Sequence, residues 1–178
     1  MILEPQIIRN FIDTRVKDIL NKWTLDNYQN SYFTDANMGE ETTTLTTRFF
    51  RSCRDIDYPT IAYQTQVKII ERFISTKFKL AQFCHGITNS ITFNNGDIRE
   101  HVDPIYLNNT TTYHFNLITQ KPIEGGITYI NNTPYETNET DLIIYPVSEV
   151  EHRVNTVKGD IPRIAWMFGF SIFKNNQL

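Results

Sequence analysis

The chain has 178 residues, enough for one domain that buries a core without disulfide or metal support. Hydrophobic residues make up 40% of it, and 17 basic against 20 acidic residues leave a net charge of -3, which disfavours a general nucleic-acid-binding protein. Its two cysteines are too few for a disulfide framework, and no stretch approaches the roughly 18 apolar residues of a membrane span.

Residues 1–79 are predicted to form helices and loops that support the rest of the domain. Residues 11–23 and 63–78 each carry a stripe of apolar side chains at helical spacing. Between them, residues 26–47 are polar and rich in Thr, Asn and Glu, so we expect a long loop there. Loops beside a rigid scaffold commonly carry specificity, which makes this segment and the polar segment 131–140 candidate substrate covers.

From residue 80 onward the sequence changes to short β-type segments. Runs of β-branched and aromatic residues alternate with Asn, Asp, Gly and Pro. The candidate strands are residues 81–87, 90–93, 98–102, 112–118, 126–130, 141–145, 152–157 and 163–173. About eight short strands favour a sandwich or barrel. We therefore predict a mainly β fold with flanking helices, as a single domain over residues 1–178 whose β core is residues 80–178.

Three residues in this β region predict a metal site. His101 and Asp103 are two positions apart, so on a strand their side chains point to the same face. His152 opens a later predicted strand. Two imidazoles and one carboxylate form the open facial arrangement of non-haem Fe(II) oxygenases, whereas structural zinc more often recruits thiolates. His85 and His114 are expected to be core or strand histidines rather than ligands.

Arg163 lies on the predicted strand that follows His152. A return strand can bring it beside the metal pocket, where a guanidinium can hold a carboxylate through two parallel hydrogen bonds. A dicarboxylate could then chelate the metal at one end and be clamped at the other. The sequence thus predicts a metal centre with a neighbouring anion site.

The order of these motifs resembles the prolyl 4-hydroxylase-type 2-oxoglutarate oxygenases. The matching stretches are FNNGDIREHVDP (93–104), EGG (124–126) and EHRVNTVKGDIPR (151–163). The family shows an aromatic-x-x-Gly before an HxD, then a Gly-Gly turn, then His-x-Val-x-x-Val-x-x-Gly leading to a basic residue. The resemblance implies a double-stranded β-helix, or jelly-roll barrel, supported by two or more N-terminal helices.

The resemblance also implies the site residues. Iron would be bound by His101, Asp103 and His152, and the distal carboxylate of 2-oxoglutarate by Arg163. Phe93 stands where the family often has a tyrosine that contacts the co-substrate. Tyr106 and Tyr113 are the two candidates to replace that contact.

The activity implied is hydroxylation of an unactivated C–H bond, with a peptidyl, prolyl-type side chain as the first expectation and release of succinate and CO2. Its cofactors would be Fe(II), 2-oxoglutarate as co-substrate and O2, with ascorbate left open. Two alternatives remain: a hydroxylase of a free amino acid or other small molecule, and a non-catalytic cupin-like binding module. Cupins often begin with His-x-His, whereas this chain has His-x-Asp. The expected partner is a peptide, protein or small-molecule substrate.

The N-terminal stretch predicts the compartment. It carries a proline and charges where a signal peptide needs an unbroken apolar run. The Asn-, Ile- and Lys-rich composition suggests an AT-rich genome. We therefore expect a cytoplasmic protein of a microbial cell or a virus-infected host cell, with no membrane contact.

Overall fold

The computed structural model describes residues 4–30, 33–35, 47–51, 58–75, 78 and 81–174, which form two antiparallel sheets. The larger sheet contains, in spatial order, β1 (Gln6–Ile8), β9 (Leu142–Tyr145), β6 (Thr110–Gln120), β11 (Arg163–Phe173), β4 (Ala81–Thr92), β3 (Thr47–Arg51) and β2 (Phe33–Asp35). The smaller sheet contains β5 (Ile98–His101), β10 (His152–Val154), β7 (Thr128–Ile130) and β8 (Thr133–Tyr135).

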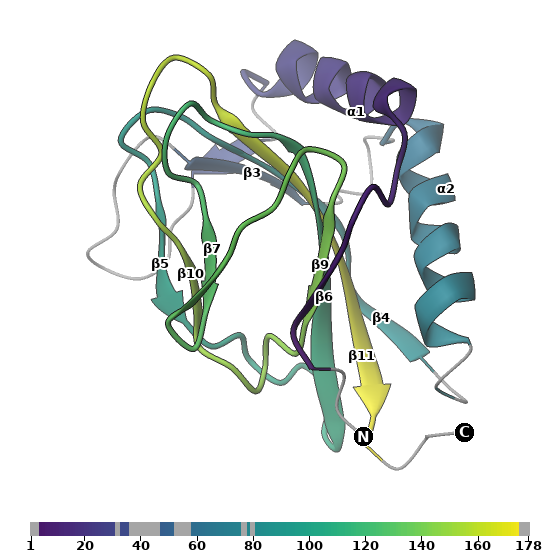
Figure 1. The fold of residues 1–178 in the computed structure, drawn as a ribbon. Coiled ribbons are helices and arrows are strands. Elements are labelled where there is room, and N and C mark those ends of the chain that lie inside the picture. Colours follow the sequence, from purple (N-terminus) through teal and green to yellow (C-terminus); the bar gives the residue numbers. More distant parts are fainter. Residues whose placement is uncertain are drawn as a thin grey trace.

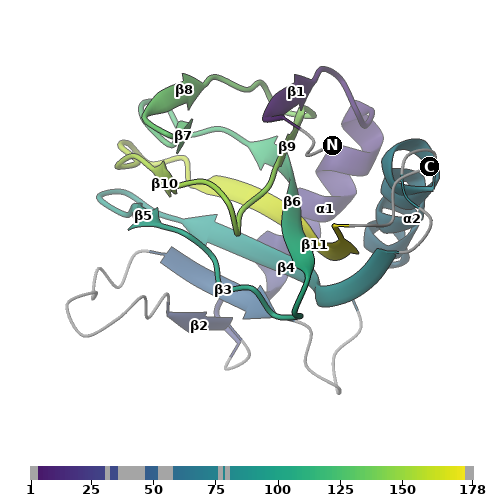
Figure 2. The same ribbon diagram turned by 90° about the horizontal axis from the view of Figure 1, so that it is seen from below.

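From β4 onward the chain alternates between the two sheets. Strands β4, β6, β9 and β11 lie in the larger sheet, while β5, the β7–β8 hairpin and β10 lie in the smaller one. The smaller sheet therefore lies over one face of the larger sheet (Figure 2). This strand order is that of a jelly roll, in which two sheets face each other around an interior.

Two helices lie on the other face of the larger sheet (Figure 1). Helix α1 (Thr14–Asn27) is capped by Asp13, whose side chain accepts a hydrogen bond from the Val16 backbone N–H at 2.9 Å. Helix α2 (Thr60–Ile69) continues into a π-helical turn, η1 (Ile70–Ile74). These elements overlap the two helical ranges expected from the apolar spacing. No helix in the described ranges is long and apolar enough to cross a membrane.

Alternation along β6 and β11 separates the main core from the interior between the sheets. On β11, Trp166, Phe168 and Phe170 are buried in the cluster that includes the helices, and Phe115 and Leu117 of β6 join them. The intervening residues of both strands face the smaller sheet instead, because successive side chains on a strand point to opposite faces. The helices thus complete the core, and the other face is left for the site.

Two predicted strands, residues 81–87 and 90–93, are joined in the single strand β4. Gly86 has a φ of +64°, and the pairing of β4 with β11 shifts register beside it, between Gly169 and Phe170. This irregularity is a β-bulge, and the strand continues through it instead of ending there.

Of the two segments expected to cover the substrate, residues 131–140 are tied to the rest of the fold. Residues 131–140 contain β8, and Thr140 is anchored on both sides: its N–H donates to Ile118 at 2.8 Å and its carbonyl accepts from Phe11 at 2.9 Å. None of residues 131–140 lines the pocket described below. Of residues 26–47, the described part holds the end of α1, β2 and the start of β3, and the rest lies outside the described residues.

Candidate metal centre

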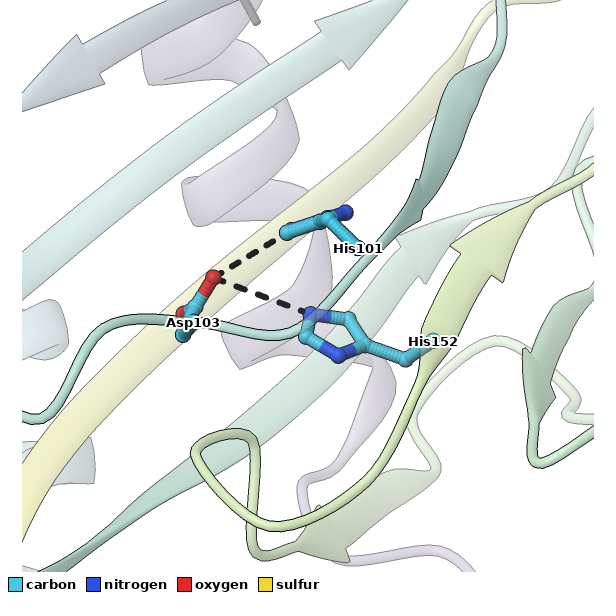
Figure 3. A group of neighbouring side chains, drawn as sticks. All are labelled: His101, Asp103 and His152. Atoms are coloured by element: carbon cyan, nitrogen blue, oxygen red, sulfur yellow. Dashed lines mark ion pairs between the residues drawn. The ribbon is translucent and has the colours of Figure 1, made fainter.

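The three predicted metal ligands converge at one point of the smaller sheet. His101 closes β5 and His152 opens β10, and these antiparallel neighbours place the two residues directly opposite each other, with ring centroids 4.2 Å apart. Asp103 follows β5, and its Oδ1 lies 3.2 Å from His101 Nε2 and 3.9 Å from His152 Nε2 (Figure 3). The three donor atoms lie within 4.8 Å of one another.

The orientation of both imidazoles suits metal binding. His101 Nδ1 lies 2.7 Å from the carbonyl of Arg99, and His152 Nδ1 lies 3.2 Å from the carbonyl of Val150. A carbonyl oxygen only accepts, so each Nδ1 carries the hydrogen and each neutral ring keeps its Nε2 lone pair. Backbone bonds of this kind fix the tautomer and orientation of metal-binding histidines. The residues present therefore fit a divalent metal with two nitrogen ligands and one oxygen ligand.

Electrostatics favour the metal-binding protonation states of two of the three residues, Asp103 and His152. Burial would raise the pKa of Asp103, but the adjacent imidazoles of His101, His114 and His152 lower it to about 2. Burial, reinforced by the charge of His101, lowers the pKa of His152 to about 4. Burial would lower the pKa of His101, yet the Asp103 carboxylate and the Arg99 carbonyl together outweigh this effect and raise it. At neutral pH Asp103 is anionic and His152 is neutral, as coordination requires.

A pocket of about 150 Å³ opens between the two sheets beside these residues. The three triad residues line it together with side chains from β4, β6, β9 and β11. The lining also includes His114 and Asn116 of β6, Tyr145 of β9, Arg163 and Gly169 of β11, and Tyr106 in the segment after β5. The metal-ligand set and Arg163 thus share one pocket, as the sequence predicted.

Arg163 is a buried cation without an acidic partner in the described part of the chain. It is 2% exposed; its Nε donates to the Gly126 carbonyl at 2.9 Å and one Nη donates to Thr128 Oγ1 at 3.3 Å. Burial lowers its pKa to about 10, so it remains charged at neutral pH. A buried charge that lacks a counter-ion is costly, and an anion in the pocket would relieve that cost.

The predicted Gly-Gly turn makes room for this arginine. Gly125 and Gly126 both have positive φ values, +76° and +67°. A Cβ at Gly126 would lie 3.1 Å from Arg163 Cδ and 2.8 Å from Pro122 Cγ. A side chain at this position would therefore clash with Pro122 and press on the arginine, so the glycine leaves room for both residues.

The two tyrosines expected near the co-substrate have different positions. Tyr106 lines the pocket and is 51% exposed. Tyr113 lies on the opposite face of β6, in the main core, where the centroid of its ring lies 6.4 Å from that of Phe78. This corrects the expectation for Tyr113, because strand alternation turns it away from the pocket. Phe93 is also outside the pocket and packs against Tyr28.

Three pocket residues, His114, Asn116 and Tyr145, were not expected from the sequence. His114 was expected to be a core or strand histidine, but it lines the pocket with its Nε2 3.4 Å from Asp103 Oδ2. Asn116 Nδ2 donates to the Tyr145 hydroxyl at 2.8 Å. The alternation of β6 was the available signal, since it places His114 and Asn116 on the face opposite Tyr113, Phe115 and Leu117. The side chain of His85 lies outside the described part of the structure.

Tyr145 is a buried phenol that faces the same pocket as Arg163. It is 2% exposed, and burial raises its pKa, so the hydroxyl keeps its hydrogen. The oxygen accepts from Asn116, but no acceptor for the hydroxyl hydrogen is found among the described residues. The pocket therefore contains a second hydrogen-bond donor beside the buried guanidinium.

Comparison with known proteins supports the fold. No protein-family model and no curated protein matches this sequence. Among solved structures, a viral collagen prolyl hydroxylase from Paramecium bursaria Chlorella virus-1 is similar at a TM-score of 0.69 and 12% identity, covering 94% of this chain and 96% of that chain. A prolyl hydroxylase from Trichoplax adhaerens is similar at a TM-score of 0.73 and 13% identity, covering 94% and 83%.

A third similar structure is HygX from Streptomyces hygroscopicus, with a TM-score of 0.67 and 7% identity, covering 96% of this chain and 83% of that chain. At such identities the likeness concerns the fold. The alternating strand order and the similarity over almost the whole chain both indicate the same fold. The resemblance to the prolyl 4-hydroxylase type of oxygenase is therefore confirmed at the level of its jelly-roll fold.

Proposed function

We propose that this protein is an Fe(II)- and 2-oxoglutarate-dependent dioxygenase. The observation that carries the proposal is the coincidence, in one pocket, of an open set of three ligands with a buried cation that has no described acidic partner. Two imidazoles and one carboxylate leave metal positions for a co-substrate and O2. A dicarboxylate fits both ends of the pocket, because one end can bind the metal and the other the guanidinium.

In this proposal, His101, Asp103 and His152 hold the iron. When bound, iron with 2-oxoglutarate supplies the oxidising chemistry: 2-oxoglutarate, O2 and a C–H bond yield succinate, CO2 and an alcohol. Arg163 binds the distal carboxylate and so orients the co-substrate. Arg163 is 2% exposed, so bulk water is excluded around its guanidinium, which strengthens the ionic contact.

The similar structures support the cofactor assignment. The viral collagen prolyl hydroxylase was solved as a complex with 2-oxoglutarate, and HygX was solved with nickel and 2-oxoglutarate and with iron. The resident metal and co-substrate proposed here are therefore of the kind seen in the same fold. O2 completes the set, and ascorbate remains an open requirement.

A peptidyl side chain, proline first, is the proposed substrate class. The loop after β5 presents the apolar side chains of Val102, Ile105 and Tyr106 to solvent, each about half exposed, beside the metal ligands. Exposed apolar groups at a pocket mouth suit an extended segment better than a small polar metabolite. The Trichoplax hydroxylase binds a peptide fragment, whereas HygX binds hygromycin B, so a small-molecule substrate is the second candidate.

The proposed function predicts a spectroscopic signature before any substrate is known. Fe(II) and 2-oxoglutarate added without oxygen are expected to give a weak visible charge-transfer band, since the co-substrate chelates the metal. Admission of O2 should then release succinate slowly without substrate. Iron binding with neither the band nor succinate would contradict the oxygenase and favour a cupin-like binding module. Proline-containing peptides should accelerate succinate release if the peptidyl class is right.

Tyr145 is proposed as a second contact for the distal carboxylate. Its hydroxyl hydrogen lacks a described acceptor, and its oxygen is oriented by Asn116. Tyr145→Phe is expected to weaken 2-oxoglutarate binding about tenfold, the effect of one hydrogen bond to a charged group. Calorimetric titration of the Mn(II)-loaded protein measures it. Tyr106→Phe is the matched variant; a loss in Tyr106→Phe alone would give the contact to Tyr106 instead.

A further inference from the structure

The Asp103 carboxylate divides its two oxygens between different imidazoles. Oδ1 faces His101 and His152, whose Nε2 atoms lie 3.2 and 3.9 Å away. Oδ2 faces His114, whose Nε2 lies 3.4 Å away. Oδ1 therefore shares the proposed metal position with the two imidazoles, and Oδ2 is contacted from outside the triad.

His114 reaches Asp103 from the opposite sheet. In the register of the larger sheet it lies between Gly169 of β11 and Tyr145 of β9. Gly169 has no side chain, which leaves space for the imidazole on the pocket face, and the Tyr145 ring lies on its other side with centroids 6.4 Å apart. The Asp103 backbone N–H donates to the Val147 carbonyl at 3.0 Å. The main chain of Asp103 is thus held by the segment that follows β9, and one of its carboxylate oxygens is contacted from β6.

We infer that His114 is a positioning residue for Asp103, a role that rests on the proposed function. In this role the 3.4 Å contact between its Nε2 and Oδ2 becomes a hydrogen bond from Nε2–H, so that only Oδ1 is presented to the metal. An aspartate has two acceptor oxygens and can bind a cation through one or both. Holding Oδ2 favours the single-oxygen mode, which leaves one more metal position open than the two-oxygen mode. Co-substrate chelation and O2 need those positions.

This inference gives His114 a function that a buried strand histidine would not have. A histidine that served only to pack could be replaced by another ring of similar size. A positioning residue needs its N–H, and partners of this kind typically change metal affinity 10–100-fold when they are removed. His114→Phe keeps the ring and removes the N–H, whereas His114→Gln keeps an N–H donor near the same point.

The test uses Co(II) alone, titrated into the metal-free full-length protein and followed by its visible absorption. His114→Phe is expected to bind Co(II) 10–100-fold more weakly than wild type, with a changed spectrum, because both oxygens of Asp103 can turn to the metal. His114→Gln should remain within about threefold of wild type and keep its spectrum. The denaturant midpoint of the metal-free protein, measured for all three, reports any packing defect separately.

Equal Co(II) affinity of wild type and His114→Phe would overturn the inference, as would equal weakness of the Gln and Phe variants with unchanged midpoints. If His114→Phe is unstable, His114→Gln against His114→Leu gives the same comparison. The proposed function fails in a different way: wild type would bind no Co(II), or would bind metal and give no band with 2-oxoglutarate.

Discussion

Replacing His101 by alanine is expected to abolish stable Fe(II) binding and leave the protein folded. His101 supplies one of the three donor atoms that lie within 4.8 Å of one another, so its loss leaves two ligands. Removing a direct ligand should exceed the 10–100-fold effect of removing an outer partner, so we expect affinity to fall by more than about 100-fold. Co(II) titration and iron content after desalting measure this, and succinate release should disappear with the metal.

Of the three proposed ligands, His101 is the most informative to replace, because its side chain contributes little to the stability of the fold. It ends β5 and its side chain is 24% exposed, whereas the His152 side chain is 7% exposed and packs against Tyr145. The free energy of unfolding of the metal-free variant should change by less than about 1 kcal/mol. Arg99→Gln, on the same strand and exposed, is the matched control. Retained iron in His101→Ala, or equal loss in Arg99→Gln, would refute the assigned triad.

The convergence of His101, Asp103 and His152 was predictable because strand geometry converts short sequence spacings into proximity. His101 and Asp103 share a face through the period of two, and the later His152 needed only one strand pairing, which the structure supplies as a direct cross-strand pair. The position of Arg163 beside the three ligands was predictable for a similar reason, since it begins β11, the strand that follows His152 in the chain. The resemblance in motif order then ranked these residues above the other histidines.

The rest of the pocket depends on how the two sheets face each other, and no local spacing states that. His114 contacts Asp103 across the interior. This contact could be predicted only if the position of β6 opposite β5 were known. Tyr113 and Tyr145 show the same limit. One aromatic residue of β6 turns into the core and one of β9 turns into the pocket, and only the sheet order says which face is which. The π-helical turn after α2 likewise had no signal in the apolar pattern.

Arg163→Met is expected to separate ligand binding from stability. Two opposing effects act on the metal-free protein. The substitution removes the hydrogen bonds to Gly126 and Thr128, each worth about 1.5–3 kcal/mol for a charged donor. It also removes a buried charge whose desolvation costs several kcal/mol. These terms nearly cancel, so the free energy of unfolding without ligand should change by less than about 2 kcal/mol, as measured by urea denaturation.

The effect of Arg163→Met on 2-oxoglutarate should be far larger. Removing one partner of a buried charge pair costs about 2–5 kcal/mol, or roughly 30- to 5000-fold in the dissociation constant. Co(II) affinity should stay near wild type, because Arg163 is not a metal ligand. Arg163→Lys keeps the charge but loses the planar pair of donors, so it should bind with intermediate affinity. A fall of 3–5 kcal/mol in the unfolding free energy of the ligand-free methionine variant, with unchanged 2-oxoglutarate affinity, would instead make Arg163 a structural cation.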